Sequence, residues 1–216
     1  MKLPGSLPFG AAAASHGQPP PLSNEEAESL RKQLAEAKLQ VELYKLVVER
    51  YHKFIEDSES KSIAELRQLV RPLDSAVTEL KIAIQDQFHP YLYQDHFLKA
   101  AETGLDMVFA WKSVSMPVSF WVSFSDMARM KAADDIDRAI LLCSLFRSLG
   151  SDNARVLIGK NKSAWVSFSF ADKQYMVDVT RKSMNAFAPK DDSLRQFMVS
   201  ILYSFNDRDY EDFSEG

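Results

Sequence analysis

Three aspartates stand close together at the start of a long apolar stretch, where carboxylates could bind a cation or do acid–base chemistry. They are Asp134, Asp135 and Asp137, and the stretch runs from Ile136 to Leu149. The cluster lacks the alternating oxygen ligands and the distal glutamate of a calcium loop, so it predicts no metal site. Because aspartate favours helix N-termini, we interpret Asp134 as the N-cap of a buried helix. Gly150 is the expected left-handed terminator of that helix.

The single cysteine, Cys143, allows neither an internal disulfide nor a cysteine-rich zinc site. It lies two helical turns, or about 12 Å, beyond Asp135, among apolar residues. We therefore expect a small buried hydrophobe and not a nucleophile. The four histidines precede the buried helix: His16, His52, His89 and His96. No glycine-rich phosphate loop occurs, and no cofactor is predicted.

The elements around this helix predict an α+β fold. Three strand-like runs follow it, Ala154 to Ile158, Ala164 to Phe170 and Gln174 to Val179, with breaks short enough for antiparallel hairpins. A helix is expected from Asp95 to Trp111 and a last one from Ser193 to Phe205. We predict a buried helix packed on a small antiparallel sheet within residues 91–205.

The N-terminal third carries a heptad pattern typical of a coiled coil. Apolar residues repeat at alternating spacings of three and four residues. In chain order they are Ala27, Leu30, Leu34, Ala37, Val41, Tyr44, Val48, Tyr51 and Ile55. Further apolar residues lie off this seam, which favours packing against more than one helix: Leu39, Leu43, Leu46, Val47 and Phe54.

A second apolar seam runs from Ile63 to Ile84 and is interrupted by Pro72. We interpret residues 24–90 as a hairpin of two antiparallel long helices; the alternative is that both seams pack on the following domain. Residues 1–23 are rich in proline, alanine and glycine and are predicted to be a disordered tail. Residues 206–216 are predicted to be a solvated acidic tail.

A succession of short motifs runs through the predicted α+β region. The chain reads A-D-D-I-D-R-A-I-L-L-C-S-L-F-R-S-L-G at 133–150, A-R-V-L-I-G at 154–159, S-A-W-V at 163–166 and D-V-T at 178–180. This order resembles the transglutaminase-like superfamily, whose members often read G-D-C-E-D-x-A-I-L-L-x-S-L-L-R-x-L-G, A-R-V-x-x-G, H-A-W-V and D-P-T. The resemblance implies a papain-like α+β fold of the type common in archaea and bacteria.

The resemblance also implies a catalytic triad, and two of its three positions have changed. The nucleophilic cysteine is replaced by Asp135 and the histidine by Ser163, while Asp178 stands at the acid position. A carboxylate is a poor nucleophile toward amides, and a serine hydroxyl does not accept a proton near neutral pH. We therefore expect a degenerate, non-catalytic domain whose former cleft is lined by Trp165, Trp121 and Asp134.

These observations predict a protein–protein interaction or scaffold module that binds a protein partner or forms a homo-oligomer through its N-terminal helices. Two alternatives stay open: a cysteine-independent amidase or hydrolase using Asp135 and Asp178, and a purely structural coiled-coil assembly protein. The formal net charge of −4 offers no basic surface for nucleic acid. No apolar run of membrane-spanning length occurs, and the lone cysteine favours a cytoplasmic location.

Overall fold

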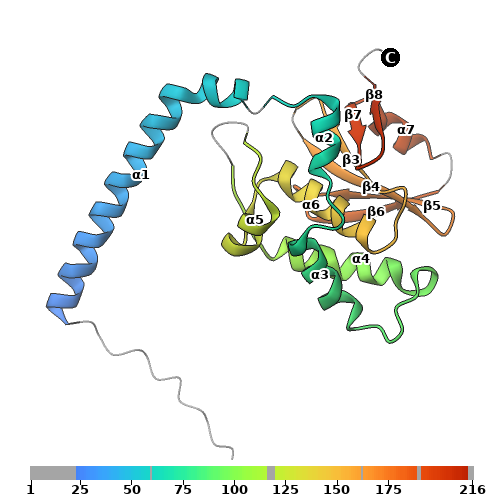
Figure 1. Cartoon of the computed structure of the whole chain (residues 1–216), viewed down its shortest axis with the longest axis horizontal. Helices are drawn as coiled ribbons and strands as arrows, with labels where there is room; N and C mark the ends of the chain where they lie inside the picture. Colours follow the sequence, from blue (N-terminus) through green and yellow to red (C-terminus); the bar gives the residue numbers. More distant parts are fainter. Residues whose placement is uncertain (1–22, 59, 116–119, 162, 189–190, 214–216) are drawn as a thin grey trace, which may run out of the picture. The chain divides into compact units, whose positions relative to one another are not determined.

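The computed structural model describes residues 23–58, 60–115, 120–161, 163–188 and 191–213. The predicted tail over 1–23 therefore lies, except for Ser23, outside the described residues. The chain divides into two compact units, Met1–Arg50 and Tyr51–Gly216. Helix α1, Asn24–Ser58, accounts for the described part of the first unit and continues into the second (Figure 1).

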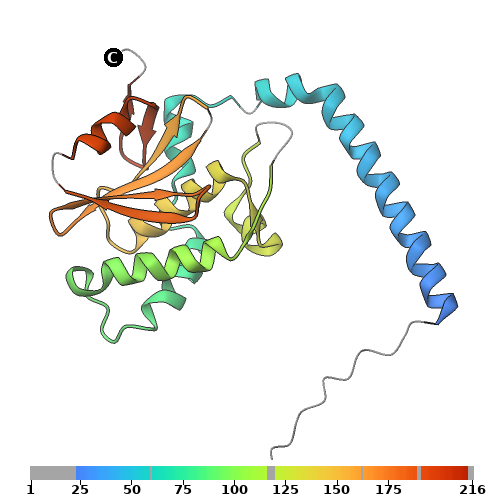
Figure 2. The same cartoon turned by 180° about the vertical axis from the view of Figure 1, so that it is seen from behind.

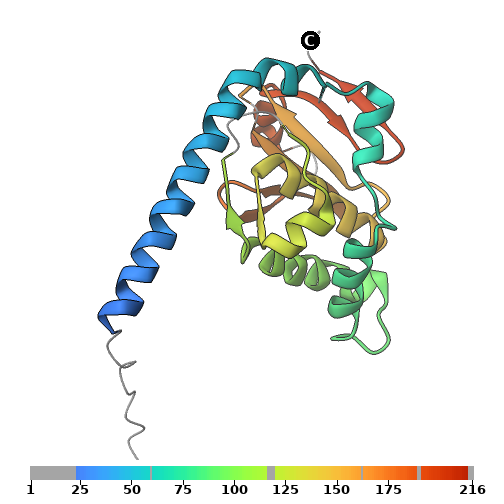
Figure 3. The same cartoon turned by 60° about the vertical axis from the view of Figure 1, so that its left-hand side comes forward.

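The second unit contains six further helices among the described residues. They are α2 (Ile63–Leu69), α3 (Ser75–Gln85), α4 (Tyr93–Phe109), α5 (Phe124–Met130), α6 (Asp135–Ser148) and α7 (Asp192–Met198). Helix α6 packs against strands β3 and β4, and α3 and α4 lie beside it (Figures 1 and 3).

The main sheet has six antiparallel strands in the order β6-β5-β4-β3-β7-β8. Their bounds are β3 (Arg155–Gly159), β4 (Ala164–Phe170), β5 (Lys173–Asp178), β6 (Ser183–Phe187), β7 (Ile201–Phe205) and β8 (Tyr210–Asp212). Two short strands, β1 (Lys112–Ser113) and β2 (Ala132–Ala133), form a separate parallel pair. The predicted α+β class is confirmed.

Alternation along the strands places different residues on the two faces of the main sheet. Val156, Val166 and Val177 point toward α6 and belong to the large core cluster. Their neighbours Leu157 and Met176 belong to a smaller cluster on the other face, covered by residues of α7 (Figure 2). Both faces of the sheet are thus buried over part of their area.

Helix α6 begins and ends where the sequence predicts. The Asp134 carboxylate accepts a hydrogen bond of 2.7 Å from the Asp137 amide, which caps the first turn. Gly150 has a φ of 111°, and the Gly150 and Ser151 amides donate to the carbonyls of Arg147 and Phe146. This is a Schellman termination, which needs a residue that tolerates positive φ.

The structure differs from the predicted hairpin over residues 24–90. The chain around Pro72 is not helical, so the second seam is divided between α2 and α3. Val70, Val77 and Ile84 are buried in the same core cluster as the apolar residues of α6. Residues 63–85 therefore belong to the α+β unit, as the alternative interpretation states for the second seam. The reason is that the core around α6 offers Val70, Val77 and Ile84 a place to pack.

The C-terminal end also differs from its prediction. The expected helix Ser193 to Phe205 is helical only as far as Met198, and its second half is strand β7. The expected acidic tail over 206–216 instead includes β8, which pairs with β7 in an antiparallel hairpin. Ion pairs between this hairpin and nearby arginines, described below, hold its acidic residues on the fold.

Candidate functional site

The Asp135 carboxylate at the N-terminus of α6 is held by three side chains. One oxygen accepts a hydrogen bond of 2.6 Å from the Thr180 hydroxyl. The other lies 3.4 Å from the Ser113 hydroxyl and 3.4 Å from Arg138 Nη1. The side chain of Asp135 is 30% exposed, so solvent still reaches it. The carboxylate is thus a structural anion at a helix N-terminus, where the helix dipole also favours it.

Arg138 is fully buried one turn into α6 and connects Asp135 to the segment before α5. Its Nη1 donates to the Ser113 hydroxyl at 3.3 Å and its Nη2 to the Trp111 carbonyl at 3.4 Å. Its Nε has no hydrogen-bond partner among the described residues. Burial lowers the pKa of Arg138, while Asp135 acts in the opposite direction. Because arginine keeps its proton in proteins, Asp135 is the counter-ion of a buried cation.

Asp137 is a second carboxyl group of the cluster and is buried, with 3% of its surface exposed. The Val122 amide donates to its two oxygens at 3.4 and 3.3 Å, which ties the segment before α5 to α6. Burial, together with the nearby Asp134, raises the pKa of Asp137 to about 8. Burial also raises the pKa of Asp134. Asp134 thus caps the helix, while the buried Asp137 side chain joins α6 to the segment before α5.

At the other two predicted triad positions, Ser163 and Asp178 make local contacts with neighbouring residues of the chain. The carbonyl of Ser163 accepts a hydrogen bond of 2.9 Å from the Gly159 amide, which closes the turn between β3 and β4. Asp178 accepts a hydrogen bond of 2.8 Å from the Arg181 amide and lies 3.8 Å from the Arg181 guanidinium. The residue that contacts Asp135 from the end of β5 is Thr180, which sequence reasoning missed although it closes the D-V-T motif.

The structure does not bring the three predicted cleft residues together. Trp165 is paired with Asp178 across β4 and β5 and packs on the α7 face, with its ring 4.9 Å from that of Phe197. Trp121 packs against the core cluster that contains α6, and Asp134 caps that helix. Trp165 and Asp134 therefore belong to opposite sides of the sheet, because successive residues of β4 alternate between its faces.

Cys143 is fully buried in α6. Burial raises the pKa of its thiol well above the usual value. A thiol that stays protonated and inaccessible is inert, in agreement with the interpretation of Cys143 as a core residue.

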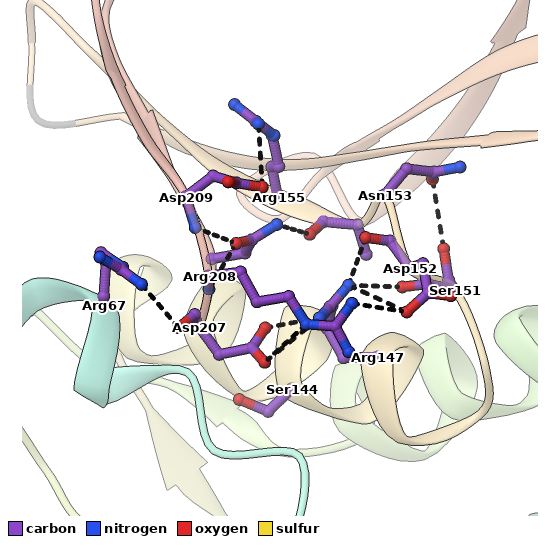
Figure 4. Close-up of polar contacts among 12 residues, drawn as sticks. Arg67, Ser144, Arg147, Ser151, Asp152, Asn153, Arg155, Asp207, Arg208 and Asp209 are labelled. Carbon is purple, nitrogen blue, oxygen red and sulfur yellow. Dashed lines mark hydrogen bonds and ion pairs between the residues drawn. The ribbon is translucent and has the colours of Figure 1, made fainter.

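At the C-terminal end of α6, a second polar network centres on Arg147 (Figure 4). Its guanidinium donates to both oxygens of Asp207, with Nε–Oδ1 at 2.6 Å and Nη2–Oδ2 at 3.2 Å. It also donates to the carbonyls of Ser151 and Asp152. The side chain of Arg147 is only 3% exposed, so its charge depends on these acceptors.

Further contacts extend this network over the β7–β8 hairpin (Figure 4). Arg67 of α2 donates to the Asp207 carbonyl at 3.5 Å, and Arg155 of β3 pairs with Asp209 at 3.3 Å and with Glu211 at 3.1 Å. Arg208 pairs with Asp152 at 3.2 Å. Asp207, Asp209 and Glu211 therefore act as counter-ions of arginines in the same chain.

Within 23–58, 60–115, 120–161, 163–188 and 191–213, no group of three or more His, Cys, Asp and Glu side chains could hold a metal ion. Over the same residues, no helix has the length and apolar character needed to cross a bilayer.

Comparisons with known proteins give a distant likeness in fold to a solved structure. Neither a protein-family model nor a curated protein matches the chain. Among solved structures, LapG from Legionella pneumophila is similar to it, with a TM-score of 0.48 and 14% identity over 77% of this chain and 88% of LapG. A likeness this distant says nothing about activity, substrate or partners.

Proposed function

We propose that this chain is a non-catalytic protein–protein interaction or scaffold module built on a transglutaminase-like α+β unit. The observation that carries the proposal is the state of Asp135. In the resembling family this position holds the nucleophile, whereas here it holds a carboxylate bound by Thr180 at 2.6 Å and by Arg138 and Ser113 at 3.4 Å. Thiol chemistry cannot occur there, and Cys143 is too deeply buried to replace it.

The hydrolase alternative has less support. A pair of carboxylates does acid–base work when both face one reacting molecule and their environments separate their pKa values. Asp135 is instead the counter-ion of buried Arg138, and Asp178 binds the amide and guanidinium of Arg181. A carboxylate that neutralises a buried arginine is needed for stability and is poorly available for proton transfer.

The test is an activity assay with a matched set of variants. The full chain is incubated with a glutamine-containing peptide, and ammonia release and peptide cleavage are followed over time. We expect rates equal to those of Asp135→Ala and Thr180→Val, and equal to the rate without protein. Release of ammonia or cleavage by the unmodified chain that disappears in Asp135→Ala, with the far-UV circular dichroism unchanged, would contradict the proposal.

A further inference from the structure

Helix α1 carries the largest set of exposed apolar side chains in the described part of the chain. On the heptad seam, Leu30, Leu34, Val41, Tyr44 and Tyr51 are 49–63% exposed. Helix α1 has 35 residues and is about 52 Å long, and most helical stability in proteins comes from packing of an apolar face. Its apolar stripe needs a partner surface of comparable length.

The heptad positions give that stripe the composition of a coiled-coil seam. Counting Leu34 as position a places Val41, Val48 and Ile55 at later a positions, and Leu30 and Tyr44 at d. Within parallel coiled coils, β-branched residues at a combined with leucine at d, as at Leu30, favour two strands over a higher number. The seam spans about four heptads, which is long enough for a coiled coil.

Charges beside the seam distinguish the two possible orientations of a self-pair. The e positions on one flank are basic: Arg31, Lys38 and Lys45. An antiparallel pair would place these basic e rows against each other, and like charges in apposition are unfavourable. A parallel pair places e opposite g of the second copy, where Gln33 and Gln40 are uncharged and can accept hydrogen bonds from lysine.

The same flank explains why a second copy fits better than an acidic partner helix. The Lys45 ammonium already pairs with Glu42 of α1 at 3.2 Å. Glu42 also follows Lys38 by four residues, a spacing at which side chains on a helix are neighbours. Glu42 therefore offsets part of this positive charge, so the basic row does not require a strongly negative partner.

We infer that α1 associates with α1 of a second copy of this chain, in parallel and in register along the Leu30–Tyr51 seam. This inference deepens the proposed interaction role and rests on it for its biological meaning. The α+β unit would then be presented in two copies at the same end of a coiled coil.

Light scattering of the full chain tests the association. We expect twice the 24.5 kDa chain mass at micromolar concentration, and about half that value for Val41→Glu. Leu43→Glu is the matched control, because Leu43 lies off the seam and is 56% exposed. A mass of one chain for the unmodified protein overturns the inference. The inference also fails if Leu43→Glu lowers the measured mass whereas Val41→Glu leaves it unchanged.

Disulfide trapping tests the orientation. In a parallel pair, Leu30→Cys brings two equivalent d-position thiols together, whereas in an antiparallel pair they lie about 30 Å apart. Mild oxidation should cross-link Leu30→Cys and spare Lys32→Cys, which points away from the seam. Because the native Cys143 is buried, it does not interfere. An associated protein in which Leu30→Cys stays uncross-linked overturns the parallel arrangement. These outcomes are independent of the activity assay above, so the two proposals fail separately.

Discussion

The pairing of Arg147 with Asp207 predicts a large loss of stability when the carboxylate is neutralised. Asp207→Asn keeps the size of the side chain and removes the counter-ion from a guanidinium that is 3% exposed. Removing one partner of a buried ion pair typically costs about 3–5 kcal/mol. Asp207 itself is 26% exposed and two carbonyls still accept from Arg147, so we take the lower end, about 3 kcal/mol.

The assay is unfolding of the full chain by urea and by heat, followed by circular dichroism and by tryptophan fluorescence. A loss of about 3 kcal/mol corresponds to a fall in Tm of roughly 6–12 °C for a unit of this size. Asp209→Asn is the control within the same hairpin, because Asp209 is 58% exposed in its pair with Arg155. A pair so exposed contributes between about 0 and 1 kcal/mol.

A double-mutant cycle separates the ion pair from other effects of the substitutions. Arg147→Met combined with Asp207→Asn should cost less than the sum of the two single variants, because no uncompensated charge stays buried. If Asp207→Asn costs no more than Asp209→Asn, or if the two single losses simply add, the reasoning about the buried pair is refuted.

Three further predictions concern single residues. The pKa of Asp137 is raised to about 8, above its unfolded value, so its contribution to stability falls as pH rises from about 4 to about 8. Asp137→Asn should remove this dependence. In urea melts between pH 5 and 7, the difference in unfolding free energy between the variant and wild type should therefore change by up to about 1.4 kcal/mol per pH unit. No change of that difference with pH would contradict the assignment. Gly150→Ala should lower Tm measurably, since the residue has a φ of 111° and a Cβ there would lie 2.9 Å from Tyr93; an unchanged Tm would argue against the left-handed turn. Ser62→Ala should cost about 1 kcal/mol, because Ser62 and Glu65 form a capping box at α2, and Glu65→Gln, which keeps a hydrogen-bond acceptor, should cost less; the opposite order would refute that account.

Local features of the fold could be predicted from the sequence because short-range physics determines them. An aspartate before an apolar run and a glycine after it define both ends of α6 through backbone hydrogen bonds made within a few residues. The strands β3, β4 and β5 follow from runs of apolar and β-branched residues separated by short turns.

The tertiary structure decided which of these features lie together. The motif residues alone gave no sign that Thr180 would bind Asp135, or that Trp165 would face α7 and not α6. Contacts of this kind depend on strand register and on alternation between sheet faces, where a shift of one residue exchanges the two sides. The acidic C-terminal segment looked solvated in sequence because its counter-ions, Arg147 and Arg155, are about 50–60 residues away along the chain and become neighbours only when β7 pairs with β3.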